Sequence, residues 1–383
     1  MFAAVLGVVV GVLAGLFPGF HTNLFAVLVA GLHFDAWTLA VFLVALAVSR
    51  SVVDVVPAVF LGASEDVMAL LPGHRMLRKG CGFEAVLLCV AGSVLGVIAG
   101  VFLVPVFILV FPFLFNLLTP WLFWLLLAAV LVLLFRDSWW SFVVFAFSGV
   151  LGLVVLDGVR EPLFPLLSGL FGASGLVLSI VNKVQIVSQN EAGLVKMRPG
   201  SLFFSVLSGV LAGSVVTLFP GLGPSQAAAL AQIKRMQSKG YLVLVGALGT
   251  VDVLISLVTF FVVGKARNGA VVVIDQLLGQ LSSSALLSLI AVACMAAGFA
   301  AVFALFVSRW YASLVENVDY SVISSIVLVV LLFMSYWLSG WLGVLTFLTA
   351  ALVGLIAPLT RTARSHSMGC LLLPVLIMLF QSS

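Results

Sequence analysis

Five long stretches of this chain carry no Asp, Glu, Lys or Arg, and they limit its fold more than any other feature. They are Met1–Phe34, Ala85–Phe135, Pro199–Ile233, Gln276–Ser308 and Tyr320–Thr360. Each exceeds the length of about 20 apolar residues that crosses a bilayer as a helix. Charged residues make up 8% of the chain, against about 25% in soluble domains. Because a segment in lipid must satisfy its own backbone hydrogen bonds, the sequence predicts an all-α polytopic membrane protein.

The remaining composition argues against nucleic-acid binding and metal binding. The formal net charge is +4, but Lys and Arg lie in short loops and form no basic face with interleaved aromatic residues. The cysteines lack metal-ligand spacing and are expected to be small buried hydrophobes; they are Cys81, Cys89, Cys294 and Cys370. We therefore expect no nucleic-acid partner, no metal site and no cofactor, apart from Na⁺ or H⁺ as a coupling ion.

An internal repeat divides the chain into two halves. The segment "GVVVGVLAGLFPGFHTN", Gly7–Asn23, returns as "GVLAGSVVTLFPGLGPS", Gly209–Ser225. The offset between the Pro-Gly pairs is 202 residues (220 − 18). A polar stretch, 182–200, separates the halves. We predict a first transmembrane repeat at 1–181, a cytoplasmic linker at 182–200 and a second repeat at 201–383.

Each half is expected to begin with a helical hairpin broken at its Pro-Gly loop, at 1–34 and 200–232, followed by about five spans. The predicted spans lie near 36–61, 83–111, 120–135, 138–156 and 163–180, then near 241–263, 284–307, 320–336, 340–358 and 368–380. The segment Gly62–Gly80 is predicted to be a loop, either solvated or partly re-entrant and gating the site.

The distribution of basic residues orients these spans, because Lys and Arg gather in cytoplasmic loops. With the linker inside, thirteen of them fall in inside loops and three, Arg160, Lys265 and Arg267, fall outside, with Arg50 within a span. Corresponding loops also differ in charge: "HFDAW" has no Lys or Arg, whereas "IKRMQSKG" has three. This reversal favours inverted-topology repeats with both termini outside. The pair Lys265 and Arg267 fits this scheme least well.

The two Pro-Gly loops are the predicted substrate site. Pro removes a backbone donor and breaks a helix, and such a break at membrane depth is tolerated where protein or a water-filled cavity satisfies the freed groups. The polar residues that follow open a new half-helix, whose N-terminus favours an anion. Paired broken helices of this kind occur in inverted-repeat transporters. The predicted substrate-binding residues are Pro18, Gly19, His21, Thr22, Asn23, Pro220, Gly221, Gly223, Pro224, Ser225 and Gln226. The alternative is that the Pro-Gly pairs are simple kinks and His21 is packed against a carbonyl.

Two acidic residues in apolar spans, Asp54 and Asp252, are the candidates for binding a coupling ion, with Ser64 as a third. Charged side chains within a membrane are costly and usually face a partner or a pathway. For Asp54 the alternative is an ion pair with Arg50 on the preceding turn of the same helix. Asp252 could instead lie near the mouth of the pathway.

The loops "LFPGFHTN" and "LFPGLGPSQAAA", with "LLPGHRMLRKGCGFEAVLLCVAGSVLG" (70–96), resemble the large membrane subunit of tripartite tricarboxylate transporters, TctA. His21 with Asn23 and the segment "RSHSMGCLLLP" (364–374) resemble its shorter archaeal branch. The resemblance implies a cation-driven carrier for carboxylates that works with a small membrane subunit and an extracytoplasmic binding protein. The chain departs at Phe60–Ser64, "FLGAS", from the Tyr-Gly-Gly-Ser-like turn that the family pattern predicts. Because of the archaeal-like features, a homo-oligomer is the alternative to an assembly with partner subunits.

The resulting prediction is a multi-pass cell-membrane protein, not an enzyme, that moves a small organic anion by secondary active transport. A flippase for a lipid-linked phosphate is the main alternative, since helix N-termini accept phosphate as well as carboxylate. An ion channel is a further alternative function. An intramembrane enzyme with His21 as base lacks a nucleophile or metal motif such as Gly-x-Ser-x-Gly or His-Glu-x-x-His.

Overall fold

A computed structural model describes residues 1–16, 35–61, 67–182, 187–189, 197–218, 227–228, 231 and 237–382, without the side chains of 67–71, 216 and 382. Within these ranges the regular structure is helical and no residue forms a strand. Eight of the described helices are long and apolar enough to cross a membrane. The prediction of an all-α, multi-pass membrane protein is therefore confirmed.

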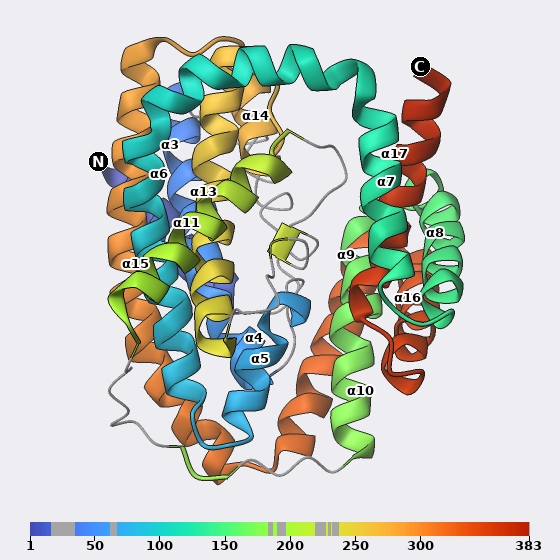
Figure 1. Ribbon diagram of the computed structural model, residues 1–383. Helices are drawn as coiled ribbons and strands as arrows, with labels where there is room; N and C mark the ends of the chain where they lie inside the picture. Colours follow the sequence, from blue (N-terminus) through green and yellow to red (C-terminus); the bar gives the residue numbers. More distant parts are fainter. Residues whose placement is uncertain are drawn as a thin grey trace.

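The described helices are divided between the two halves of the sequence (Figure 1). The first half contains α1 (Phe2–Leu16), α3 (Ala36–Val53), α4 (Val55–Leu61), α5 (Val67–Leu77), α6 (Gly82–Leu118), η1 (Thr119–Trp121), α7 (Leu122–Phe135), α8 (Trp140–Gly158), α9 (Leu163–Leu167), η2 (Ser168–Ala173) and α10 (Ser174–Val181). The second half contains α11 (Pro199–Val216), α13 (Ser238–Val263), α14 (Gly269–Leu278), α15 (Ser283–Asn317), α16 (Tyr320–Leu359), η3 (Arg364–Met368) and α17 (Gly369–Ser382).

The helix bounds repeat along the chain at the offset of the Pro-Gly loops. Shifting α3 and α4 together, 36–61, by 202 residues gives 238–263, the bounds of α13. Helices α5 and α14 begin at 67 and 269, and α6 and α15 begin at 82 and 283. The segment α16 consists of two helices that meet at the non-helical residue Gly340, whose φ of 63° suits glycine. The position 202 residues earlier, 138, lies in the turn between α7 and α8.

The first helix of each half packs on its neighbour through the same glycine. A Cβ atom on Gly7 would lie 2.4 Å from the Phe42 carbonyl oxygen, so α1 and α3 touch through their backbones. A Cβ atom on Gly209 would lie 2.5 Å from the Leu244 carbonyl oxygen on α13. Both residues of the second contact are 202 positions after those of the first (209 − 7; 244 − 42). The two halves therefore share this interface in the same register.

Helices α6 and α13 join the halves through a second backbone contact. A Cβ atom on Gly92 would lie 2.1 Å from the Val243 oxygen, and one on Gly246 would lie 2.0 Å from the Cys89 oxygen. The Ser93 hydroxyl donates a hydrogen bond to the Gly246 carbonyl at 3.0 Å. Small residues of this kind let membrane helices approach closely. Such close packing matters in a membrane, because lipid offers no hydrophobic driving force between helices.

The described helices form two bundles (Figure 1). One hydrophobic cluster is built mainly from α1, α3, α4, α6, α11, α13, α14 and α15. A second cluster is built from α7, α8, α9, η2, α16, η3 and α17. The segment α6–η1–α7 passes over the top of the view from one bundle to the other. Each bundle therefore combines helices from both halves of the sequence.

The linker between the halves is anchored by Gln189, which is 8% exposed. Its side-chain oxygen accepts a hydrogen bond from the Gly82 N–H at 2.9 Å. Its side-chain nitrogen donates to the carbonyl oxygens of Leu77 at 3.0 Å and Val187 at 2.6 Å. Its backbone N–H donates to the Glu316 carboxylate at the end of α15. Gln189 thus joins the α5–α6 turn, which its side-chain amide contacts, to α15 of the second half, which its backbone N–H contacts.

Replacing Gln189 by alanine is expected to lower stability by about 2 to 4 kcal/mol, because the Gly82 N–H and the Leu77 carbonyl lose their partner in a buried site. Thermal unfolding in detergent would measure this loss. Ser188→Ala is the matched control, because it removes only a long, exposed hydrogen bond from the Ser188 hydroxyl to Glu316 at 3.4 Å, and it should melt close to the native protein. Equal melting temperatures for the two variants would show that the Gln189 contacts are dispensable.

The prediction that Gly62–Gly80 is a loop is wrong for most of its length, because Val67–Leu77 forms α5 despite Pro72. A Cβ atom on Gly73 would lie 3.0 Å from the Val59 side chain and 3.5 Å from that of Leu242. The His74 ring nitrogen Nδ1 lies 3.1 Å from the Val59 carbonyl oxygen. The packing of α5 against α4 and α13 therefore outweighs the tendency of Pro72 to break a helix.

Candidate functional site

All eleven predicted substrate-binding residues of the two Pro-Gly loops lie outside the described residues, as does Ser64. The structure places the two acidic candidates, Asp54 and Asp252. It also describes α1 and α11, which lead into the loops and end at Leu16 and Val216. The loops themselves remain a prediction.

Asp54 lies between α3 and α4, which together form one continuous span, Ala36–Leu61. Its backbone N–H donates to the Arg50 carbonyl at 2.9 Å, and its own carbonyl accepts from Ala58 at 3.1 Å, as in an unbroken helix. A Cβ atom on Gly15 would lie 3.2 Å from the Asp54 nitrogen, so the end of α1 packs against this part of the span. Asp54 is half-buried.

The helix carrying Asp54 runs antiparallel to the helix carrying Asp252. A Cβ atom on Gly249 of α13 would lie 3.0 Å from the Ser51 hydroxyl of α3. Further along α4, the side chains of Val59 and of Leu242 on α13 both pack against Gly73 of α5. The chain thus advances from 51 to 59 in one helix while it returns from 249 to 242 in the other. Because the helices are antiparallel, Asp54 and Asp252 lie on either side of the contact between Ser51 and Gly249, about 9 Å apart along the helix axes at 1.5 Å per residue.

Asp252 belongs to a polar cluster that the sequence alone did not reveal. The Asn268 amide nitrogen Nδ2 donates to the Asp252 oxygen Oδ2 at 2.8 Å. The Asn268 oxygen Oδ1 accepts from the Ala270 N–H at 3.1 Å and caps α14. The Ser256 hydroxyl accepts from the Asn268 N–H at 2.9 Å and from the Arg267 N–H at 3.1 Å. Asp252 and Ser256, one turn apart on α13, therefore hold the start of α14.

The chain reaches this cluster by turning back after α13. The helix ends at Val263, and Gly264 adopts the left-handed conformation with φ 69°. Ser256 lies seven residues before Val263 (263 − 256), which is about 10 Å along a helix axis at 1.5 Å per residue. Arg267 and Asn268 are thus held about two turns inside the end of α13. Helix α14 then returns beside the upper part of α13 (Figure 1).

A signal for this arrangement was present in "VVGKARNGAVVVI", 262–274. Gly264 interrupts an apolar run, and Asn268 immediately precedes another, which is typical of a helix C-terminus followed by an N-cap. The partner of Asn268 could not be read from that pattern, since it depends on the turn. The structure also shows where Lys265 and Arg267 lie, the two outside basic residues that fit the predicted orientation least well. Lys265 places its nitrogen 4.8 Å from the centre of the Phe115 ring, and Arg267 is half-buried.

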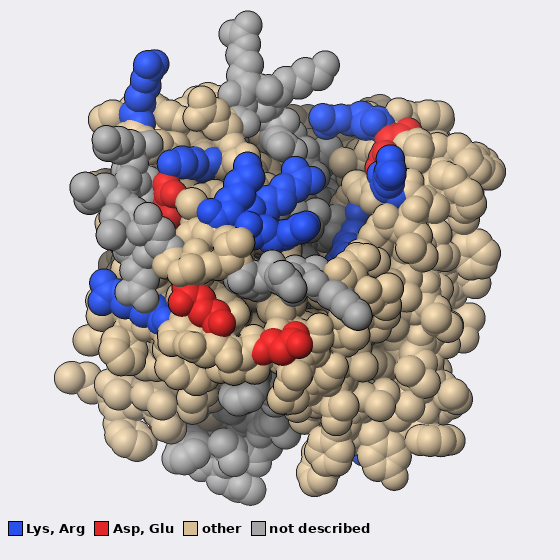
Figure 2. All heavy atoms as spheres, turned by 90° about the horizontal axis from the view of Figure 1, so that it is seen from below, with Lys and Arg blue, Asp and Glu red and all other residues tan. Residues whose placement is uncertain are grey.

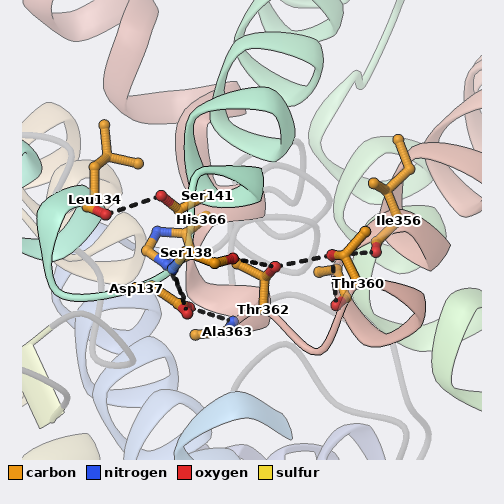
Figure 3. A network of polar contacts seen from close by, with 10 residues as sticks. Leu134, Asp137, Ser138, Ser141, Ile356, Thr360, Thr362, Ala363 and His366 are labelled. Atoms are coloured by element: carbon orange, nitrogen blue, oxygen red, sulfur yellow. Dashed lines mark hydrogen bonds and ion pairs between the residues drawn. The ribbon is translucent and has the colours of Figure 1, made fainter.

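A second polar network joins the α7–α8 turn to the α16–α17 turn (Figure 3). The Asp137 oxygen Oδ2 accepts from the Ala363 N–H at 2.7 Å and lies 3.1 Å from the His366 nitrogen Nε2. Oδ1 accepts from the Ser138 N–H at 2.8 Å. Partial burial alone would raise the pKa of Asp137, but these hydrogen bonds outweigh it and lower the pKa below its usual value. The network ties the second bundle together.

Comparison with known proteins assigns the chain to a family. The model of the tripartite tricarboxylate transporter TctA family matches residues 1–369. An uncharacterised protein of the archaeon Methanocaldococcus jannaschii is 25% identical over 399 aligned residues, which cover 97% of each chain. No solved structure matches. The repeated helices, the acidic residues on facing spans and the match over nearly the whole length agree: the chain belongs to the tripartite tricarboxylate transporter TctA family.

Proposed function

We propose that this chain is a secondary active transporter that moves a small organic anion, a carboxylate, across the cell membrane. A gradient of Na⁺ or H⁺ drives the transport, and alternating access occurs around the two Pro-Gly loops. Membership of a transporter family supports this class of function. The eight apolar helices among the described residues support a location in the membrane.

The observation that carries the proposal is the relation between α3–α4 and α13. These helices match at the single offset of 202 residues, yet Ser51 lies beside Gly249 while Val59 and Leu242 both pack against Gly73, so they run in opposite directions. Equivalent helices with opposite directions are what inverted repeats require. Many secondary transporters use such repeats to open a central site alternately to either side.

The charge distribution supports the proposed orientation. Lys and Arg gather on the face seen from below (Figure 2), and the α5–α6 turn, the start of α13 and the end of α15 lie toward that face (Figure 1). Lys239 at the start of α13 pairs there with Glu84 at 2.5 Å. The positive-inside rule makes this face cytoplasmic. Both labelled termini lie in the upper half of Figure 1, and we place them outside.

Asp252 is the better supported of the coupling-ion candidates. One of its oxygens accepts the bond from Asn268, which fixes the carboxylate within an apolar span. Asp54 lies within the antiparallel span of α3 and α4 and is the second candidate. A carboxylate in such a place can bind Na⁺ or take up a proton as part of the transport cycle.

The family indicates further components. TctA proteins are part of tripartite transporters, and we propose that this chain works with a small membrane subunit and an extracytoplasmic binding protein, or else as a homo-oligomer. Purification of the tagged chain from its native membrane distinguishes these arrangements by the polypeptides that accompany it.

The substrate site is tested by Asn23→Ala and Ser225→Ala, one in each Pro-Gly loop. Each is expected to weaken carboxylate binding by about 1.5 to 3 kcal/mol, the value of one hydrogen bond to a charged group. Calorimetric titration with mono-, di- and tricarboxylates measures the affinities. Thr349→Val is a suitable control, because that hydroxyl is exposed and bonds only within its own helix, to Leu345 at 2.8 Å. Unchanged binding in both loop variants, or a preference for cations, would rule out this site.

A further inference from the structure

Arg267 occupies a position that a simple surface loop would not provide. It lies between the left-handed turn at Gly264 and the first residue of α14. Its backbone N–H donates to Ser256 at 3.1 Å, and its neighbour Asn268 bonds Asp252. The side chain therefore starts about 10 Å inside the end of α13, beside the polar cluster of a central span.

The guanidinium of Arg267 has no compensating charge among the described residues. Its nitrogen Nε is buried without a hydrogen-bond partner there, and the ion pairs identified in that part of the chain involve Lys239 and His366 instead. The carboxylate of Asp252, which is close in the fold, is bonded to the Asn268 amide. Arginine keeps its proton under all ordinary conditions. The buried Nε–H is therefore a donor that lacks an acceptor, and leaving such a donor unsatisfied is costly.

Lys265, two residues earlier, provides the contrast. Its ammonium group lies over the Phe115 ring at 4.8 Å, an arrangement in which the ring quadrupole stabilises the cation. The same short segment thus supplies an internal partner for one basic side chain. The other basic side chain, Arg267, has the planar fork suited to a carboxylate, and its Nε has no partner among the described residues.

We propose that Arg267 binds a carboxylate group of the transported anion. The inference rests on the proposed function, because it names a residue for the same substrate. A carboxylate oxygen would accept from the buried Nε–H, which has no acceptor among the described residues, and would meet the charge that arginine always carries.

Calorimetric titration of the purified full-length chain with acetate, succinate and citrate, with and without Na⁺, tests the proposal. Arg267→Ala is expected to weaken citrate binding roughly tenfold to hundredfold, since it removes a charge-assisted hydrogen-bonding partner. The affinity of Arg267→Lys for citrate should lie between those of Arg267→Ala and the native protein, because lysine keeps the charge but lacks the planar fork of two donors. Lys265→Ala is the matched control and should bind citrate as the native protein does.

The order of affinities separates binding from a structural role. Loss of Arg267 should reduce the preference for citrate over acetate, whereas mere loosening of the fold would weaken all three ligands together. Sulfate and phosphate titrations show whether the site prefers carboxylates or accepts any oxyanion.

Three results would overturn the inference. They are native affinity in Arg267→Ala, equal losses in Arg267→Ala and Lys265→Ala, and a stronger response to sulfate or phosphate than to any carboxylate. If the native chain binds none of the anions, the proposed function fails and this inference fails with it. If the native chain binds and only the Arg267 effect is missing, the proposed function stands without this residue.

Discussion

Gly246→Ala should strongly destabilise the folded protein, although it adds a single methyl group. That methyl carbon would lie 2.0 Å from the Cys89 carbonyl oxygen, so α6 and α13 must move apart. The separation also breaks the bond from Ser93 to the Gly246 carbonyl. Overpacking a core costs about 1 to 3 kcal/mol, and a backbone oxygen cannot turn away as a side chain can. We expect at least about 3 kcal/mol here, at the upper end of that range.

Gly298→Ala provides the control for this prediction. Gly298 lies within α15, a comparable apolar span, and a Cβ atom there would meet nothing within 4 Å. Alanine favours a helix over glycine by about 1 kcal/mol, so this variant should be as stable as the native protein or slightly more stable. Size-exclusion chromatography and thermal unfolding in detergent compare the two. Similar melting temperatures would show that the α6–α13 contact does not hold the halves together.

Asp252→Asn should abolish gradient-driven accumulation of the substrate and leave exchange of substrate across the membrane largely intact. The asparagine oxygen can still accept the bond from Asn268, which measures 2.8 Å in the native protein, so the start of α14 keeps its position. The charge that binds Na⁺ or H⁺ is lost. Uptake against a concentration gradient and homologous exchange, measured in the same vesicles, separate coupling from translocation.

Asp157→Asn is the matched control for the loss of a carboxylate, because Asp157 is exposed near the end of α8. It should accumulate substrate as the native protein does. If Asp252→Asn also accumulates substrate normally, coupling resides elsewhere, and the corresponding change at Asp54 becomes the next test. If Asp252→Asn loses exchange as well as accumulation, the residue serves translocation itself.

The spans were predictable from the sequence because apolar length alone determines where a chain can cross a membrane. The span predicted at 36–61 matches α3 and α4, and the span predicted at 163–180 matches α9 to α10. The two spans predicted at 320–336 and 340–358 correspond to the two helices within α16, which meet at the non-helical residue Gly340. The short helices were missed: α5 and α14 are half the length of a span and lie between predicted spans.

The polar cluster around Asp252 was predictable only in part. An acid within an apolar span signalled a functional position, which is a local property of the sequence. Its partner Asn268 lies sixteen residues further along (268 − 252), and the contact exists because the left-handed turn at Gly264 sends the chain back along α13. Similarly, the polar linker was predicted as a connection, but the burial of Gln189 depends on contacts with both halves.

Accumulation of a carboxylate in right-side-out vesicles from cells that express the chain tests the central proposal most directly. Radiolabelled citrate and succinate are supplied outside, and an inward gradient of Na⁺ or H⁺ is imposed. We expect the internal concentration to rise above the external one and to fall back when an ionophore dissipates the driving gradient. Uptake that only equilibrates, or accumulation that persists after both gradients are dissipated, would contradict a cation-coupled anion transporter.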